Sequence, residues 1–144
     1  MIDVFIEGGR NRRVVEIYMF NLINALGMGR LRKPYIEVSF ERGLDALGYC
    51  TGERTEASIE IAIRCPIDGS KISFLDQMRT LAHEMVHARQ YIRGQLGSDS
   101  GDWQWKGKSA KNYKYENQPW EKEAYGLESA LFMTCFPFSA EFKN

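Results

Sequence analysis

The two histidines of this 144-residue chain lie four residues apart, in the segment His83-Glu84-Met85-Val86-His87. On a helix, residues four apart project from the same face, so both imidazoles can bind one metal ion at about 2.0–2.1 Å. Glu84 lies about 100° around the helix from His83 and is free to accept a proton from a metal-bound water. The segment therefore predicts a Zn²⁺ site formed by His83 and His87, with Glu84 as a general base.

A catalytic zinc usually takes three protein ligands and keeps one position for water. The chain has no third histidine, so the third ligand must be of another type. Cysteine is possible, but the three cysteines form no Cys-x-x-Cys pair and a better ligand set exists. Aspartate can also bind zinc, but a glutamate on the helix that follows is the best candidate. Glu121 and Glu123 lie in the segment expected to form that helix.

This arrangement resembles that of zincin metallopeptidases of the short gluzincin kind, in which HExxH is followed by a glutamate on the next helix. The chain is also similar to small phage and bacterial metallopeptidases grouped loosely as SprT-like, many of which carry Glu-x-x-Ala and then a polar residue on that helix. Here the segment Pro119-Trp120-Glu121-Lys122-Glu123-Ala124-Tyr125 matches. The resemblance covers roughly residues 58–135. It implies a zinc-dependent peptidase with Glu121 as the third metal ligand and Glu123 as the alternative.

Two features depart from these families. Four residues after Glu121 stands Tyr125, where the resemblance leads us to expect an aspartate or asparagine that orients the first histidine. SprT proteins also follow a pattern with a third histidine, which this chain lacks. The residue that orients His83 is therefore left open by the sequence.

The resemblance also implies the steps of peptide hydrolysis. Zinc would lower the pKa of its water toward about 7, and Glu84 would take the proton and pass it to the leaving amine. A donor for the oxyanion is needed as well, and Tyr113, Tyr115 and Tyr125 are equal candidates. In zincins an edge strand beside the cleft binds extended substrate. The strand expected at Ser58–Arg64 directly precedes the active helix and is the candidate, an internal strand being the alternative.

Hydrophobic periodicity predicts the elements that position these residues. An active-site helix is expected from Ser73, its N-cap, to about Gly94. An α+β fold class follows: a small zincin-like domain in which a mixed sheet packs on an N-terminal helix and the HExxH helix, with a C-terminal ligand helix after them. We expect a single domain over residues 1–144. The other predicted elements are helices at 12–26 and from Pro119 to about Cys135, and strands at 2–6, 35–40, 47–51 and 58–64.

The segment 94–117 is polar and aromatic. Trp103-x-Trp105 and Tyr113-x-Tyr115 are interpreted as alternating residues of a loose hairpin. Lysines interleave with these aromatic residues, which is compatible with a nucleic-acid surface, but a solvated hairpin is favoured because the net charge is zero. The basic residues that raise this question are Lys106, Lys108, Lys111 and Lys114, and, nearer the N-terminus, Arg10, Arg12, Arg13, Arg30, Arg32 and Lys33.

The composition narrows the class of protein. Nineteen basic residues balance nineteen acidic ones, so a strong overall field for nucleic acid or an anionic membrane is absent. No stretch approaches the roughly 18 apolar residues of a membrane-spanning helix, and acidic residues interrupt the N-terminus too early for a secretory signal. Cys50, Cys65 and Cys135 are odd in number and widely spaced, which favours reduced thiols. We therefore expect a cytoplasmic protein without membrane contact, and the resemblance implies that its substrate is a peptide or protein.

Two further functions are compatible with the motif. The first is a catalytically silent metal-binding or partner-binding domain. The presence of Glu84 argues against it, because a non-catalytic site does not need that base. The second is a protease associated with DNA, which steeply salt-dependent DNA binding would identify.

Overall fold

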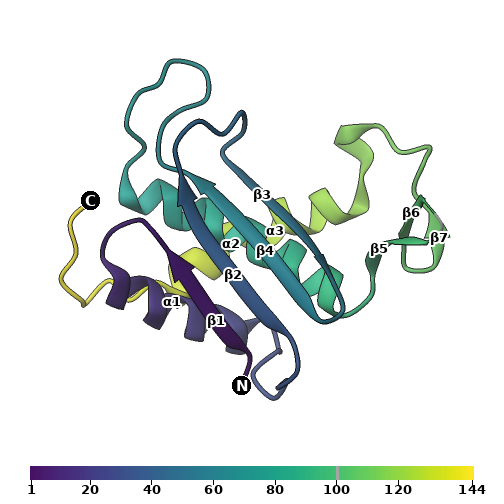
Figure 1. Ribbon diagram of the computed structural model, residues 1–144, viewed down its shortest axis with the longest axis horizontal. Helices are drawn as coiled ribbons and strands as arrows, with labels where there is room; N and C mark the ends of the chain where they lie inside the picture. The colour runs from purple at the N-terminus through teal and green to yellow at the C-terminus, as the bar shows by residue number, and fades with distance from the viewer. Residues whose placement is uncertain (100) are drawn as a thin grey trace.

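The first 62 residues supply all four strands of a sheet that is covered by helices on one face. The computed structural model describes residues 1–99 and 101–144. The sheet comprises β1 (Asp3–Glu7), β2 (Tyr35–Glu41), β3 (Gly48–Glu53) and β4 (Glu56–Ala62), and the α-helices are α1 (Arg12–Ala25), α2 (Phe74–Ile92) and α3 (Pro119–Cys135) (Figure 1). This mixed sheet with three α-helices confirms the predicted α+β fold class.

Alternating burial fixes the orientation of the two central strands. Ile36 and Val38 of β2, and Ile59 and Ile61 of β4, are buried against the helices, while the residues between them face outward. Successive side chains of a strand point to opposite faces, so a strand with apolar residues at every second position buries only one face. The alternation seen in the sequence therefore predicts correctly both these strands and the face that they bury.

The strand order is β1-β2-β4-β3. β1, β2 and β4 are parallel, and β3 runs antiparallel to β4 at the edge. The expectation of an edge strand at residues 58–64 is therefore wrong, because β4 is internal. A hairpin at residues 54–55 joins β3 to β4. The second arm of this hairpin, β4, pairs with β2, so the first arm, β3, lies outside it. Position along the sequence does not reveal which arm of such a hairpin lies outside.

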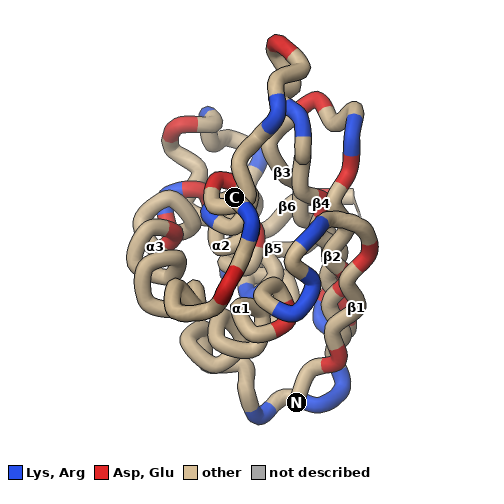
Figure 2. Tube along the Cα trace, turned by 90° about the vertical axis from the view of Figure 1, so that its left-hand side faces the viewer, with Lys and Arg blue, Asp and Glu red and all other residues tan. Residues whose placement is uncertain are grey.

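The helices lie in two layers on one face of the sheet (Figures 1 and 2). α2 contacts β3 and β4, and α3 packs on α2 and α1. α2 therefore lies between the sheet and α3 and is buried on both sides. The polar residues of α2 that point away from the sheet contact α3. His83 faces Glu128 while Gln90 faces Trp120, which shows that the two helices run antiparallel.

α2 begins where the sequence predicts. The Ser73 side chain accepts a hydrogen bond from the Asp76 amide at 3.2 Å, and this N-cap satisfies one of the free N–H groups of the first turn. The helix ends at Ile92, and Gly94 follows with φ of +69°, a conformation that glycine adopts at low cost. These two ends place the HExxH segment in the middle of a 19-residue helix.

The segment after α2 forms a second, small sheet of β5 (Leu96–Asp99), β6 (Asp102–Trp105) and β7 (Lys108–Ser109). Trp103 and Trp105 lie on β6, as expected. Tyr113 and Tyr115 do not form the partner strand, so that part of the prediction is wrong: Tyr113 precedes the 3₁₀ helix η1 (Tyr115–Asn117) and packs on Trp120 with ring centroids 5.9 Å apart. Trp105 packs on the same ring at 6.1 Å, so this aromatic contact joins the small sheet to the start of α3.

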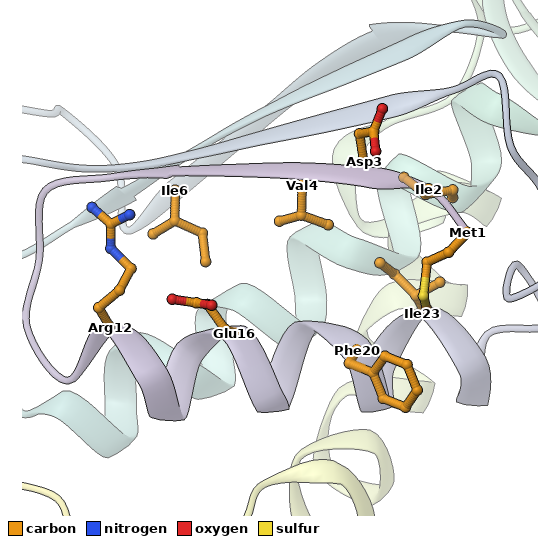
Figure 3. Close-up of a pocket in the computed structure, with 9 residues that line it drawn as sticks. All are labelled: Met1, Ile2, Asp3, Val4, Ile6, Arg12, Glu16, Phe20 and Ile23. Carbon is orange, nitrogen blue, oxygen red and sulfur yellow. The ribbon is translucent and has the colours of Figure 1, made fainter.

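A groove of about 400 Å³ runs between the free edge of β1 and α1. Figure 3 shows Val4 and Ile6 of β1 pointing toward the helix, and Arg12 and Glu16 of α1 pointing back toward the strand. None of the predicted site residues lines this groove. Among the described residues, no helix has the length and apolar character that crossing a membrane requires.

Candidate metal centre

His83, His87 and Glu121 come together at the contact between α2 and α3. The Oε1 atom of Glu121 lies 3.1 Å from Nε2 of His83 and 2.8 Å from Nε2 of His87. The three potential ligand atoms all lie within 4.8 Å of one another. α2 supplies both histidines from one face because they are four residues apart, and the first turn of α3 supplies the carboxylate.

This group could hold a metal ion. Ligands about 2.0–2.1 Å from one tetrahedral ion stand about 3.4 Å apart, and the separations of 2.8, 3.1 and at most 4.8 Å bracket that value. Two imidazole nitrogens and a carboxylate oxygen form a donor set that suits Zn²⁺ and other divalent first-row metals. Three protein ligands would leave a fourth position of a tetrahedral ion for water, which is the pattern of catalytic sites.

Glu123, the alternative third ligand, lies elsewhere. Its Oε1 atom accepts hydrogen bonds from Gln90 at 3.2 Å and from Arg89 at 3.4 Å. Two residues along a helix correspond to a rotation of about 200°, so Glu121 and Glu123 cannot present their carboxylates in the same direction. The structure thus brings Glu121, and not Glu123, to the histidines.

The electrostatics of the group favour positive charge at its centre. Burial opposes ionisation of Glu121, but hydrogen bonds from His83 and His87 outweigh it and lower the pKa of Glu121 to about 2. Burial likewise disfavours the charged imidazoles, yet the hydrogen bonds with Glu121, together with the nearby Glu84 carboxylate, raise the pKa of both histidines. The carboxylates of Glu121 and Glu84 thus stabilise positive charge on the imidazoles. The same negative charge would stabilise a bound metal cation.

His87 is oriented by a residue that the sequence analysis missed. Its Nδ1 atom lies 2.8 Å from Oε1 of Gln90, an acceptor, so Nδ1 carries a hydrogen, and Nε2 would be the free nitrogen of the neutral ring that a metal binds. Gln90 is fully buried, and its amide nitrogen donates to the main-chain oxygen of Trp120 at 3.0 Å. Its position three residues after His87 on a helix is the signal that could have found it.

His83 is held differently from what the resemblance predicts. Tyr125, at the position expected for an orienting aspartate or asparagine, packs its ring against the imidazole with centroids 4.6 Å apart. The carboxylate next to Nδ1 of His83 is that of Glu128, at 3.4 Å. Glu128 stands seven residues after Glu121, two helical turns along the same face of α3, and this spacing was the available signal.

Glu84 is buried beside this group. It is 5% exposed, and its Oε2 atom has no hydrogen-bond partner among the described residues. Burial raises the pKa of Glu84, and the neighbouring histidines oppose that shift. With His83 and Glu121 it lines a pocket of about 300 Å³, whose other lining residues are Ala46, Leu47, Gly48, Thr80, Tyr115, Tyr125 and Glu128.

Gly48 allows β3 to pass close to α2 at this pocket. A Cβ atom there would stand 2.7 Å from Cγ2 of Thr80 and 3.2 Å from Cγ of Glu84. We expect Gly48→Ala to destabilise the fold by about 1–3 kcal/mol through overpacking, measured by denaturant unfolding. Adding Thr80→Ser, which removes the nearest methyl group, should recover part of the loss.

The matched control for this prediction is Gly126→Ala. Gly126 lies within α3 with open space around its Cα, so alanine there should stabilise by up to about 1 kcal/mol. Equal unfolding midpoints for the native protein and Gly48→Ala would show that the close approach does not constrain the pocket.

No protein-family model matches the chain, and no curated protein matches it significantly. The fold and the site together define an α+β protein in which a His-His-Glu group could hold a metal ion.

Proposed function

We propose that this chain is a zinc-dependent peptidase of the HExxH type. One observation carries the proposal. His83, His87 and Glu121 form a group that could hold a metal ion, and the buried carboxylate of Glu84, whose Oε2 makes no hydrogen bond to any residue that the structure describes, lines the same pocket. Burying the Glu84 carboxylate costs desolvation free energy, and a metal site with only a structural role does not require such a group beside it.

The chemistry follows from the roles of these side chains. Zinc bound at the group would acidify water and polarise the scissile carbonyl. Glu84 accepts a proton from the attacking water at its carboxylate and gives it to the amide nitrogen as the C–N bond breaks. One water is consumed, and a carboxylate and an amine are released. The raised pKa of Glu84 suits both halves of this cycle, because an acid that must return its proton needs a pKa closer to neutrality than that of a free carboxyl.

Two of the three candidate tyrosines support an oxyanion-stabilising role. The hydroxyl groups of Tyr115 and Tyr125 lie 3.1 Å apart, and both residues line the metal pocket. Their mutual hydrogen bond raises the pKa of Tyr115, so its hydroxyl stays protonated and can donate to a developing oxyanion. Tyr113 packs on Trp120 instead and does not line the pocket.

The substrate strand is assigned to β3 in place of β4. β3 is one of the two edge strands of the sheet, and Gly48 at its start and Leu47 just before it line the metal pocket. The unpaired main-chain groups of an edge strand bind an extended peptide by strand addition. A peptide added there would run alongside α2, past the metal group.

A library of unstructured peptides tests the proposal. The zinc-loaded protein should cleave internal peptide bonds, a chelator should abolish the cleavage, and stoichiometric zinc should restore it, with products identified by mass spectrometry. The presence of bound zinc with no cleavage of any library member would favour the silent metal-binding domain instead.

A further inference from the structure

A second pocket, of about 380 Å³, is lined by basic side chains from four separate segments. Arg10 follows β1, Arg42 follows β2, Arg64 follows β4, and Lys71 lies in the loop before α2. Ile63, Gly9 and the buried side chain of Gln77 complete the lining. No residue of this pocket is shared with the metal pocket.

The topology of the sheet gathers these charges. β1, β2 and β4 are parallel, so their carboxyl ends lie at one edge of the sheet, and an arginine follows each of them within three residues. Figure 2 views the molecule from this side and shows several Lys and Arg segments around the strand ends. In open α/β sheets, ligands bind outside the carboxyl ends of the strands, and the three parallel strands of this mixed sheet present their carboxyl ends in a similar way.

At least three of the four charges, those of Arg42, Arg64 and Lys71, are not neutralised by an ion pair within the described part of the chain. Among the described residues, no Asp or Glu carboxylate lies within 4.0 Å of the side-chain nitrogens of Arg10, Arg42, Arg64 or Lys71. Arg64 and Lys71 even form a β-bridge with each other, and like charges directly opposite on paired strands are destabilising. A bound anion would relieve this repulsion.

One of the four side chains is already held in place. The guanidinium of Arg10 donates to the main-chain oxygen of Asn144 at 2.8 Å and lies 5.9 Å from the ring centroid of Phe74. These contacts use part of its donor set and keep the residue half-buried at the pocket. Arginine presents five N–H donors in a planar fork that matches phosphate, so further donors are left for a ligand.

We propose that this pocket binds a phosphate-bearing small molecule. Its volume lies in the range of small-ligand sites, about 300–1,000 Å³, and three arginines and one lysine on a concave wall suit a multiply charged phosphate. A concave site of this size accepts a discrete anion, whereas a nucleic-acid backbone requires an extended basic stripe. The site is independent of the proposed peptidase activity.

The test is calorimetric titration at low salt with pyrophosphate and with inorganic phosphate. We expect saturable binding to the native protein, stronger for pyrophosphate, and a loss of at least about tenfold in affinity in the double variant R42S/R64S. The matched control is R30S/R32S, which removes the same charge from exposed positions before β2, at the opposite end of the strands, and should bind like the native protein. The same titration is repeated with Glu121→Ala, which lacks a proposed metal ligand. Binding that persists in this variant is binding in the basic pocket and not at a metal.

A titration followed by NMR on the native protein needs no variant and should shift the amide signals of Arg10, Arg42, Arg64 and Lys71 together. Three results would overturn the proposal: no saturable binding, an equal loss in R42S/R64S and R30S/R32S, or binding lost in Glu121→Ala alone. Binding of single-stranded oligonucleotides is measured last. Affinity that rises with their length and exceeds that for pyrophosphate would reject a small-molecule site in favour of a nucleic-acid surface.

Discussion

Replacing Glu84 with glutamine is expected to reduce kcat/KM for peptide hydrolysis by about 10²–10⁴-fold while the zinc content stays at the native level. Glutamine has nearly the same shape as glutamate but cannot accept and return the proton. Glu84 is not one of the three residues whose ligand atoms converge, so the metal should remain bound. The effect should appear mainly in kcat, because the proton transfer takes place in the chemical step.

The variant should also fold. Oε2 of Glu84 has no hydrogen-bond partner within the described part of the chain, so exchanging the carboxylate for an amide breaks no described contact at that atom, and it removes a charge whose burial is costly. Zinc content and the unfolding midpoint are therefore the controls measured beside the kinetics. Activity within a few-fold of native, at equal zinc content, would show that Glu84 is not the base.

Replacing Glu121 with alanine is expected to weaken zinc binding by more than about 100-fold, measured by competition with a chromogenic chelator. Removal of residues that merely orient a ligand costs about 10–100-fold, so loss of a ligand itself should exceed that range. The Oε1 atom of Glu121 contacts both histidines, and its carboxylate is ionised because its pKa is held at about 2. Its removal takes away the one negative ligand of the group.

Glu123→Ala is the matched control, since the two glutamates stand two residues apart in the first turns of α3. Glu123 accepts from Gln90, but Gln90 also donates to the main-chain oxygen of Trp120 and would stay in place. We therefore expect zinc affinity within about tenfold of native. The reverse ranking, with Glu123→Ala losing zinc and Glu121→Ala retaining it, would assign the ligand to Glu123.

Local spacing explains why much of the site could be predicted from the sequence. His83, Glu84 and His87 lie within five consecutive residues of a helix that its apolar period and its Ser73 cap define, so their relative directions follow from helix geometry alone. Glu121 was harder, because it depends on how α3 packs against α2. Only a resemblance to known families pointed to it before the structure placed it next to the histidines.

The features that could not be predicted depend on contacts distant in sequence. Whether β3 or β4 forms the edge of the sheet is decided by which arm of a hairpin pairs with β2, and both arms have strand-like sequences. Gln90 and Glu128 were missed as partners of the imidazoles because their spacing is common on helices and gains meaning only when α2 and α3 face each other. The basic pocket likewise exists only because parallel pairing brings three strand ends together.

Bound zinc per chain, determined by elemental analysis, tests the central claim most directly. The protein would be equilibrated with zinc, freed of excess metal and compared with a sample purified without added metal. The account predicts about one zinc per chain, held by His83, His87 and Glu121. The absence of stoichiometric metal even after zinc is added would contradict the account and leave His83 and His87 as histidines that pair with the acidic residues of α3.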